Sequence, residues 1–305
     1  MRRIYLVILI IFFPCFLTGQ MIPLTDQYLN NTMAINPAFA GCHDALSALI
    51  SFRKQWIGFK DAPENLILSV HSPISRDRVG LGMLVERTSM GIYNTTTFSG
   101  NYAYRMELSR GKLALGLGFS AAVYNVLWDQ LDVTDPGDEL LADNTDSAVL
   151  PDFSLGGYYY TSKFFIGISM PMFLSHEFNK IAGNYTIKND FSEYTYLLTG
   201  GYYIGITPQV KILPSALLKY TPLHGPQVDL NAQVILNDRI WFGAGYRNRN
   251  TILGMLQCQL NHQLKMAYTY NFDTGKMGKY NSGSHEIVMN YVFDYVRKVV
   301  GPRNF

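Results

Sequence analysis

Apolar and polar residues alternate one by one along several stretches of this chain, and this pattern restricts what the chain can form. The clearest run covers residues 264–273, in which Leu264, Met266, Tyr268, Tyr270 and Phe272 alternate with Lys265, Ala267, Thr269, Asn271 and Asp273. A period of two places the apolar side chains on one face of a β-strand, whereas side chains on one face of a helix recur about every 3.6 residues. Residues 97–108, 227–236 and 287–295 follow the same rule. We therefore expect an all-β protein with two-faced strands.

The number and length of these segments separate two kinds of β-protein. Counting them from Leu46 to Tyr295 predicts about fourteen strands of roughly 9 to 16 residues, long enough to cross a bilayer when tilted. A soluble sandwich also has many alternating strands, but strands of globular sheets usually have about 5 to 6 residues. The stretch from Gly111 to Val126 is far longer. The predicted fold is an antiparallel transmembrane β-barrel of about fourteen strands.

Composition agrees with a wall that faces lipid. Charged residues make up 16% of the chain and aromatic residues 14%, whereas soluble domains have about 25% charged residues. Tyr and Trp suit the two membrane–water interfaces, where the ring is buried and the polar tip stays wet. The formal net charge of +2 gives no indication of nucleic-acid binding.

The predicted links between strands alternate in length. Short turns are expected at 75–78, 109–111, 161–162, 207–208, 237–238 and 261–262. Longer or more irregular links are expected at 55–63, 128–150, 173–191, 221–226 and 273–284, with 88–91 and 248–250 as short exceptions. Outer-membrane barrels have short periplasmic turns and longer external loops. We therefore expect both termini in the periplasm.

The chain opens with a leader that indicates export. Arg2 and Arg3 precede an apolar run that ends at Leu17, and Thr18-Gly19-Gln20 provides small residues for cleavage. A membrane anchor is the alternative, but the run is shorter than the roughly 20 residues of a spanning helix. We expect a signal peptide at 1–19, a periplasmic lead-in or plug segment at 20–45, an outer-membrane barrel at 46–295 and a periplasmic C-terminal tail at 296–305.

The sequence carries no catalytic motif. It lacks a Gly-x-Ser-x-Gly elbow, and its Gly-Leu-Gly triplets lack the rest of a phosphate-binding fingerprint. His71 beside Ser72, and His285 beside Glu286, would face opposite sides of regular strands, so neither pair is expected to act together. We expect a protein that is not an enzyme and needs no cofactor.

Two segments carry side chains of the metal-ligand type without a complete pattern. Cys42-His43-Asp44 has no second cluster at metal-ligand spacing. The acidic stretch 129–146 includes Asp135, Asp138 and Asp143, oxygen donors of the kind that bind calcium, but in no EF-hand spacing. A solvated loop is the simpler interpretation. No metal site is expected, and these three aspartates are weak calcium candidates.

The segment ahead of the first predicted strand has the most specific local pattern. Asp26-Gln27-Tyr28 leads to Ile35-Asn36-Pro37-Ala38-Phe39-Ala40-Gly41, followed by Ser51-Phe52-Arg53-Lys54-Gln55-Trp56-Ile57-Gly58-Phe59, Ala62-Pro63, Ser69-Val70-His71-Ser72-Pro73-Ile74 and Val79-Gly80-Leu81-Gly82. In this order the motifs resemble those of the PorP/SprF family, outer-membrane proteins of the type IX secretion and gliding machinery of Bacteroidetes-type bacteria. The signature residues, with no assigned role, are Asn36, Pro37, Phe39, Gly41, Arg53, Trp56, Gly58, Pro63, His71 and Pro73.

The chemistry of several of these residues predicts their local conformation or position. Pro37 disfavours helix at Asn36, and Gly41 permits a conformation closed to residues with a side chain. Phe39 is expected to pack under or into the barrel mouth. Arg53 is expected to face the lumen or a loop, and Trp56 to join an interfacial girdle. For each residue of the opening, a plain turn that starts the first strand is the alternative.

The resemblance implies a function without catalysis. It implies an outer-membrane component of type IX secretion that engages the C-terminal sorting domain of particular exported, adhesin-like proteins. Its partners would be that domain, the type IX translocon, periplasmic-ring components and outer-membrane lipid. A general porin or small-molecule channel is the alternative, in which the charged residues Arg105, Glu107, Lys112, Lys265 and Asp273 would line a passage. Inward charge alone does not separate the two.

Overall fold

The computed structural model of the chain describes residues 26–43, 45–74, 78–127, 148–179, 184–188, 190–248 and 250–293. The expected signal peptide at 1–19, the calcium candidates Asp135, Asp138 and Asp143, and the expected tail at 296–305 lie outside the described residues. Among the described helices, none is long and apolar enough to span a membrane.

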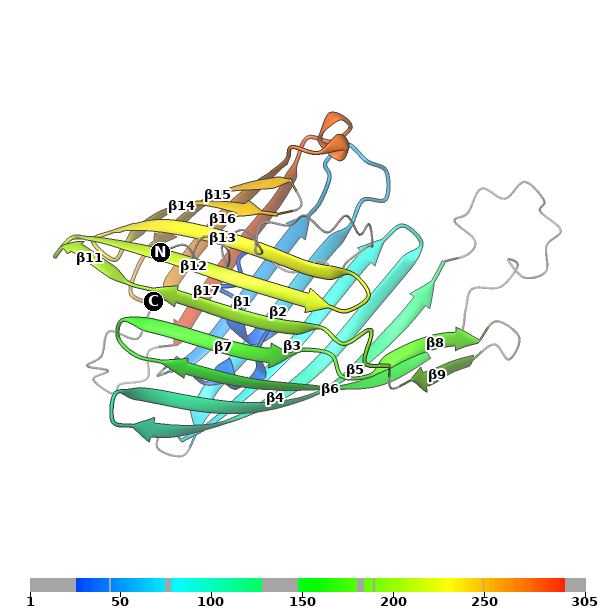
Figure 1. Cartoon of the computed structure of the whole chain (residues 1–305), viewed down its shortest axis with the longest axis horizontal. Helices are drawn as coiled ribbons and strands as arrows, with labels where there is room; N and C mark the ends of the chain where they lie inside the picture. The colour runs from blue at the N-terminus through cyan, green and yellow to red at the C-terminus, as the bar shows by residue number, and fades with distance from the viewer. Residues whose placement is uncertain are drawn as a thin grey trace, which may run out of the picture.

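The strands form one closed antiparallel β-barrel (Figure 1). Its strands are β1 (Leu46–Lys54), β2 (Glu64–Ile74), β3 (Val79–Met90), β4 (Tyr93–Leu108), β5 (Gly111–Val126), β6 (Ala148–Tyr160), β7 (Phe164–Met170), β10 (Tyr196–Tyr202), β11 (Ile204–Thr207), β12 (Val210–Thr221), β13 (Gly225–Leu236), β14 (Ile240–Arg247), β15 (Thr251–Gln259), β16 (Leu264–Asp273) and β17 (Ser284–Phe293). Both β10 and β11 pair with β12, so they make one wall strand interrupted at Tyr203. Because β10 also pairs with β7, the sheet closes, and the wall has 14 strands, as predicted.

The predicted period of two separates the two faces of the wall. On β13, Asp229, Asn231 and Gln233 face inward and are 2%, 7% and 6% exposed. Leu230 lies between them and is 53% exposed. An apolar outer face and a polar inner face are the arrangement that a lipid-embedded barrel requires.

The strand register shows which ends of the strands lie together. Leu46 pairs with Phe293, so the start of β1 and the end of β17 lie at one end of the barrel. The short connections that follow β2, β4, β6, β11, β13 and β15 start from this end too, and we call it the terminal end. The opposite end, called the loop end, carries links that include 55–63, 171–195 and 274–283.

One predicted link was wrong and another contains an additional element. Thr221 pairs with Gly225, which leaves a short turn at 222–224 where a longer or more irregular link was expected. Gly225 has φ +72° and so permits this tight turn. The long link expected at 173–191 contains a two-stranded hairpin of β8 (Ser175–Asn179) and β9 (Asn184–Lys188).

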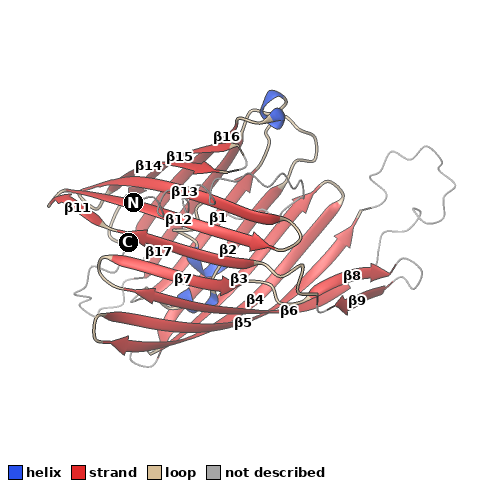
Figure 2. Ribbon diagram, in the orientation of Figure 1, coloured by secondary structure: helices blue, strands red, loops and turns tan. Residues whose placement is uncertain are grey.

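Part of the chain lies inside the barrel. Residues 26–43, which we call the plug, include the 3-10 helices η1 (Thr32–Ala34) and η2 (Pro37–Phe39). Figure 2 shows these helices within the ring of strands; η5 (Lys276–Lys279) lies in a link at the loop end. The plug contacts inward-facing residues of the wall, so the core of the molecule lies between plug and wall.

Candidate functional site: a plugged lumen and a pocket at its terminal end

Asp26 attaches the start of the plug to the wall through charged groups. Its carboxylate forms ion pairs with Arg53 Nε on β1 and Arg247 Nη2 on β14, each at 2.9 Å. Arg247 also pairs with Asp229 on β13 at 2.7 Å, and Asn271 on β16 donates a hydrogen bond to Asp26. The Asp26 side chain is 1% exposed. Buried charges are tolerated when they are paired, so each member of this cluster needs the others.

The cluster keeps Asp26 negatively charged. Burial acts to raise the pKa of Asp26, but the guanidinium groups of Arg53 and Arg247 outweigh burial and hold this pKa below its ordinary value. The backbone N–H of Asp26 donates to Glu286 Oε2 on β17 at 2.8 Å. Five strands, β1, β13, β14, β16 and β17, therefore meet around the first plug residue.

Tyr28 fills the space beneath the neighbouring part of the wall, at β12 and β13. Its hydroxyl donates to Ser215 Oγ on β12 at 3.1 Å and accepts from Asn231 Nδ2 on β13 at 3.1 Å. The ring is 2% exposed and packs in a buried cluster with Ile35, Leu197 and Leu217. The polar tip and the apolar ring of Tyr28 are thus both satisfied inside the barrel.

Asn36 joins the plug to β6 and β7. Its backbone is extended, with φ −147° and ψ 110°, as expected before a proline, and its Oδ1 accepts from the N–H of Ala38 at 3.0 Å. This is an N-cap on η2, in which Pro37 occupies the first turn. Asn36 Nδ2 donates to the carbonyl oxygens of Gly157 at 3.1 Å and Ile168 at 3.3 Å.

Inward-facing glycines of the wall make room for the plug backbone. A Cβ on Gly116 of β5 would overlap the backbone of Ala38, and a Cβ on Gly156 of β6 would overlap the side chain of Asn36. Ala38 itself is fully buried. The close approach explains why glycine alternates with large outward residues on these strands.

Gly41 lies near the end of the plug, at the terminal end of the lumen. Its φ is +68°, and a Cβ there would lie 2.7 Å from Gly80 Cα, so a side chain is excluded by both conformation and space. The N–H of Gly41 donates to His71 Nδ1 at 3.1 Å. Arg105 of β4 donates to the carbonyl oxygens of Ala40 at 3.1 Å and Val79 at 3.2 Å.

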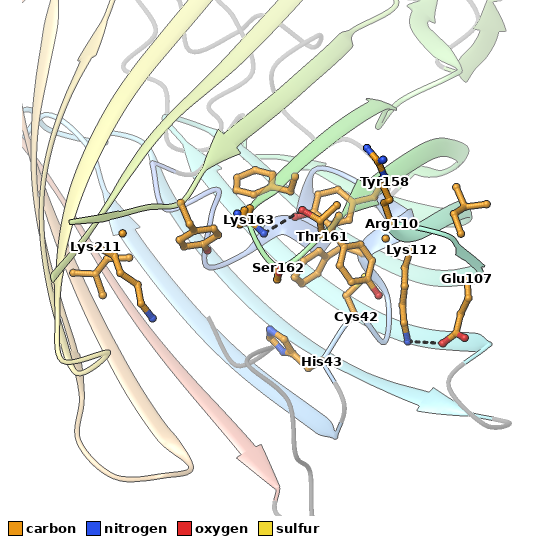
Figure 3. A pocket seen from close by; sticks show the side chains of 18 of the residues that line it. Cys42, His43, Glu107, Arg110, Lys112, Tyr158, Thr161, Ser162, Lys163 and Lys211 are labelled. Atoms are coloured by element: carbon orange, nitrogen blue, oxygen red, sulfur yellow. Dashed lines mark hydrogen bonds and ion pairs between the residues drawn. The ribbon is translucent and has the colours of Figure 1, made fainter. Parts of the chain in front are cut away.

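A cavity of about 670 Å³ lies at the terminal end, next to the plug (Figure 3). Its lining is rich in aromatic rings, from Phe39, Tyr158, Tyr160, Phe165 and Tyr203. The turns at its rim supply the cations Arg110 and Lys163, and the adjoining strand ends supply Lys112, Lys211 and the acid Glu107. Four cations against one acid make the lining positive, so the cavity suits an anionic ligand with an apolar body.

The cavity is suited to binding and has no activated thiol. Cys42 lies in its lining, and burial raises the pKa of this thiol to about 11, although the nearby Arg105 acts in the other direction. A thiol with such a pKa is protonated at neutral pH and is a poor nucleophile. The part of the chain that the structure describes holds no group of three His, Cys, Asp or Glu side chains that could bind a metal ion.

The structure brings together some of the signature residues and separates the others. Asn36, Pro37, Phe39 and Gly41 belong to the plug, and Arg53 and His71 bind plug residues from the wall. Phe39 makes edge-to-face contacts with His71 and Tyr158 inside the barrel. Trp56, Gly58 and Pro63 lie in the link after β1 at the loop end, and Pro73 lies near the end of β2. Trp56 has φ 44°, and its N–H donates to Ser284 Oγ at 3.1 Å.

Several residues that hold the plug were not singled out from the sequence as plug contacts. Asp26, Arg247 and Asn271 are far apart in the chain and carry no shared motif. The wall glycines are visible in the sequence as breaks in the alternation. Inward positions of these strands usually hold a polar side chain, but here they hold glycine, at Gly80, Gly82, Gly116 and Gly156.

The sequence matches the profile of a known protein family. The profile of the type IX secretion system membrane protein PorP/SprF matches residues 17–291. The chain belongs to the PorP/SprF family. The predicted family is therefore confirmed, and this PorP/SprF protein is an outer-membrane component of type IX secretion.

Solved outer-membrane proteins are similar to this PorP/SprF protein. The outer membrane protein Omp33 of Acinetobacter baumannii matches with a TM-score of 0.50 at 5% identity, over 83% of this chain and 100% of that chain. A bacterial polysaccharide outer membrane secretin has a TM-score of 0.48 at 13% identity, over 83% and 99%. A FadL homologue of Pseudomonas aeruginosa has 0.47 at 11%, over 91% and 96%. At 5% identity the likeness to Omp33 concerns the fold alone. No curated protein matches the chain.

Proposed function

We propose that this PorP/SprF protein is a non-enzymatic docking component of type IX secretion. It engages the C-terminal sorting domain of particular exported surface proteins and assists their export or surface attachment. The observation that carries the proposal is the occupied lumen, since residues 26–43 are bonded to the inner wall from Asp26 to Gly41. A barrel filled by its own chain suits docking on its ends better than passage through its middle.

The same contacts weigh against a general porin. In an open channel the inward charges would face water. Here Arg105 donates to two backbone carbonyl groups, and Lys265 Nζ lies 5.8 Å from the centre of the Trp241 ring. Glu107 and Asp273 lie at opposite ends of the barrel, so they do not share one constriction.

We place the terminal end in the periplasm and the loop end outside the cell. The short turns at the terminal end and the longer links at the loop end support this orientation. Both ends of the barrel segment, Leu46 and Phe293, then face the periplasm. Translocon and periplasmic-ring components would contact the protein from that side.

Capture of an exported protein tests the proposed function. Tagged barrel, isolated from detergent-solubilised membranes, should carry the terminal domain of one surface protein, and deletion of the barrel should retain that protein inside the cell. A second surface protein, exported independently of this barrel, is the control. An unchanged set of surface proteins in the deletion strain, together with stable ion conductance by the purified barrel, would favour the porin.

A further inference from the structure

The wall of the barrel has a strand edge beside the cavity that no described strand covers. On β10, pairing with β7 ends where Tyr202 lies opposite Phe164, and the N–H of Tyr203 then donates to the Lys163 carbonyl oxygen at 2.7 Å. Beyond this point β11 pairs with β12 alone among the described strands. An edge of this kind presents backbone N–H and C=O groups to any extended chain that approaches it.

The two faces of β11 differ, and its inner face is a wall of the cavity. Tyr203, Gly205 and Thr207 line the cavity. Ile204 and Ile206, between them, are 40% and 58% exposed, and the pairing of β11 with β12 shifts register between Gly205 and Thr207. Gly205 faces open space, because a Cβ there would meet no atom within 4 Å. The strand edge and the hollow are therefore parts of one surface.

Positive charge at the rim remains available to a ligand. Lys112 pairs with Glu107 at 3.2 Å, and Lys211 pairs with Asp238 at 2.6 Å. Arg110 and Lys163 are exposed and form no ion pair with any residue that the structure describes. Figure 3 shows both residues in the turns that border the cavity.

We propose that β11 and this cavity bind an extended, acidic segment of an exported protein. The segment adds a strand to the free edge of β11, places an apolar or aromatic side chain on the rings of Tyr160 and Phe165, and sets carboxylates beside Arg110 and Lys163. Strand addition draws affinity from backbone hydrogen bonds and selectivity from pockets for alternate side chains. Naming the exported protein as the source of the segment rests on the proposed function; the binding site itself does not.

The geometry favours a peptide over a lipid. Apart from the turn residues at its rim, the lining belongs to the wall strands and to the plug, so the wall lies between the cavity and the bilayer. A lipid head group would use the cations but would leave the backbone groups of β11 without partners. A four-residue strand spans about 13 Å, which is enough to place two alternate side chains of a ligand in the cavity.

A fluorescent peptide that alternates phenylalanine and glutamate tests the site on the purified full barrel in detergent. Fluorescence anisotropy should show saturable binding, weaker by about tenfold for the twin peptide with glutamine in place of glutamate. Gly205→Phe, which fills the open space, should abolish binding. Gly100→Phe is the matched control, because Gly100 also has no atom near a Cβ but faces outward. The double variant Arg110→Glu/Lys163→Glu should abolish binding too, whereas Lys60→Glu at the loop end should not.

The outcomes separate the site from the function. Binding that survives Gly205→Phe and the double charge reversal overturns the site, as does equal binding of the glutamine twin. Displacement of the peptide by vesicles of anionic lipid, at the same charge concentration as the glutamate peptide, also overturns it in favour of a lipid. If Gly205→Phe abolishes peptide binding but the barrel still captures its surface protein from membranes, the proposed function stands and this site is not the cargo site. If the peptide binds but the wild-type barrel captures no surface protein, the site stands and the function fails.

Discussion

The carbonyl oxygen of Ala40 occupies the place that a side chain on Gly80 would need. The plug therefore depends on a wall position without a Cβ. Gly80→Val should strain this contact and destabilise the folded barrel by about 1–3 kcal/mol. The unfolding midpoint in denaturant measures the effect. Gly100→Val, which meets open space on the outer face, should change the midpoint little; equal shifts in both variants would show that any added side chain disturbs the strands.

Asp26→Asn should be costly because it leaves Arg53 and Arg247 buried without their shared partner. Removal of one member of a buried ion pair costs about 3–5 kcal/mol, and the side chains of Asp26 and Arg53 are 1% and 7% exposed. Glu64→Gln is the matched control, since it breaks a pair with Lys54 whose side chains are 41% and 44% exposed, and exposed pairs contribute about 0–1 kcal/mol. Denaturant unfolding of both variants measures the difference. A cost for Asp26→Asn no larger than that of Glu64→Gln would contradict the assigned anchor.

Acid should weaken the same anchor. The pKa of Asp26 is lower in the folded protein than its ordinary value of 3.8. A depressed pKa means that the unfolded chain binds the proton more readily, so this contribution to stability is present above the ordinary pKa and is lost as pH falls through the folded pKa. As the pH is lowered below about 4, the denaturant concentration at the unfolding midpoint of the wild-type protein should decrease. The midpoint of Asp26→Asn should decrease less over the same pH range. Parallel pH profiles for the two proteins would rule out this role for Asp26.

The sequence predicted the wall far better than the lumen. Alternation along β13 and β16 follows directly from lipid on one side of the wall and polar groups on the other. Each of these strands can therefore be predicted from its own residues. The plug contacts are not local, since Asp26 and Arg247 are 221 residues apart. A repeating pattern within a strand does not show that two such distant residues are in contact. Local chemistry did predict the extended Asn36 and the left-handed Gly41. The β8–β9 hairpin and the free edge of β11 depend on where neighbouring strands end. Alternation of apolar and polar residues does not predict these end points.

Deletion of Asn36–Gly41 should reduce partner capture more than it reduces barrel assembly. The wall strands pair with one another without this segment, whereas Phe39 lines the cavity that we assign to the partner. Heat-modifiable migration on gels reports assembly, and co-purification of the surface protein reports capture. An equal loss of both would mean that the segment is needed for the barrel itself.

Ion conductance in planar lipid bilayers tests most directly whether the plug closes the lumen. The purified wild-type barrel should give no stable conductance steps, and a variant that lacks residues 26–43 should give stable steps while keeping heat-modifiable migration. Stable steps of the same size from both proteins would contradict the plugged barrel.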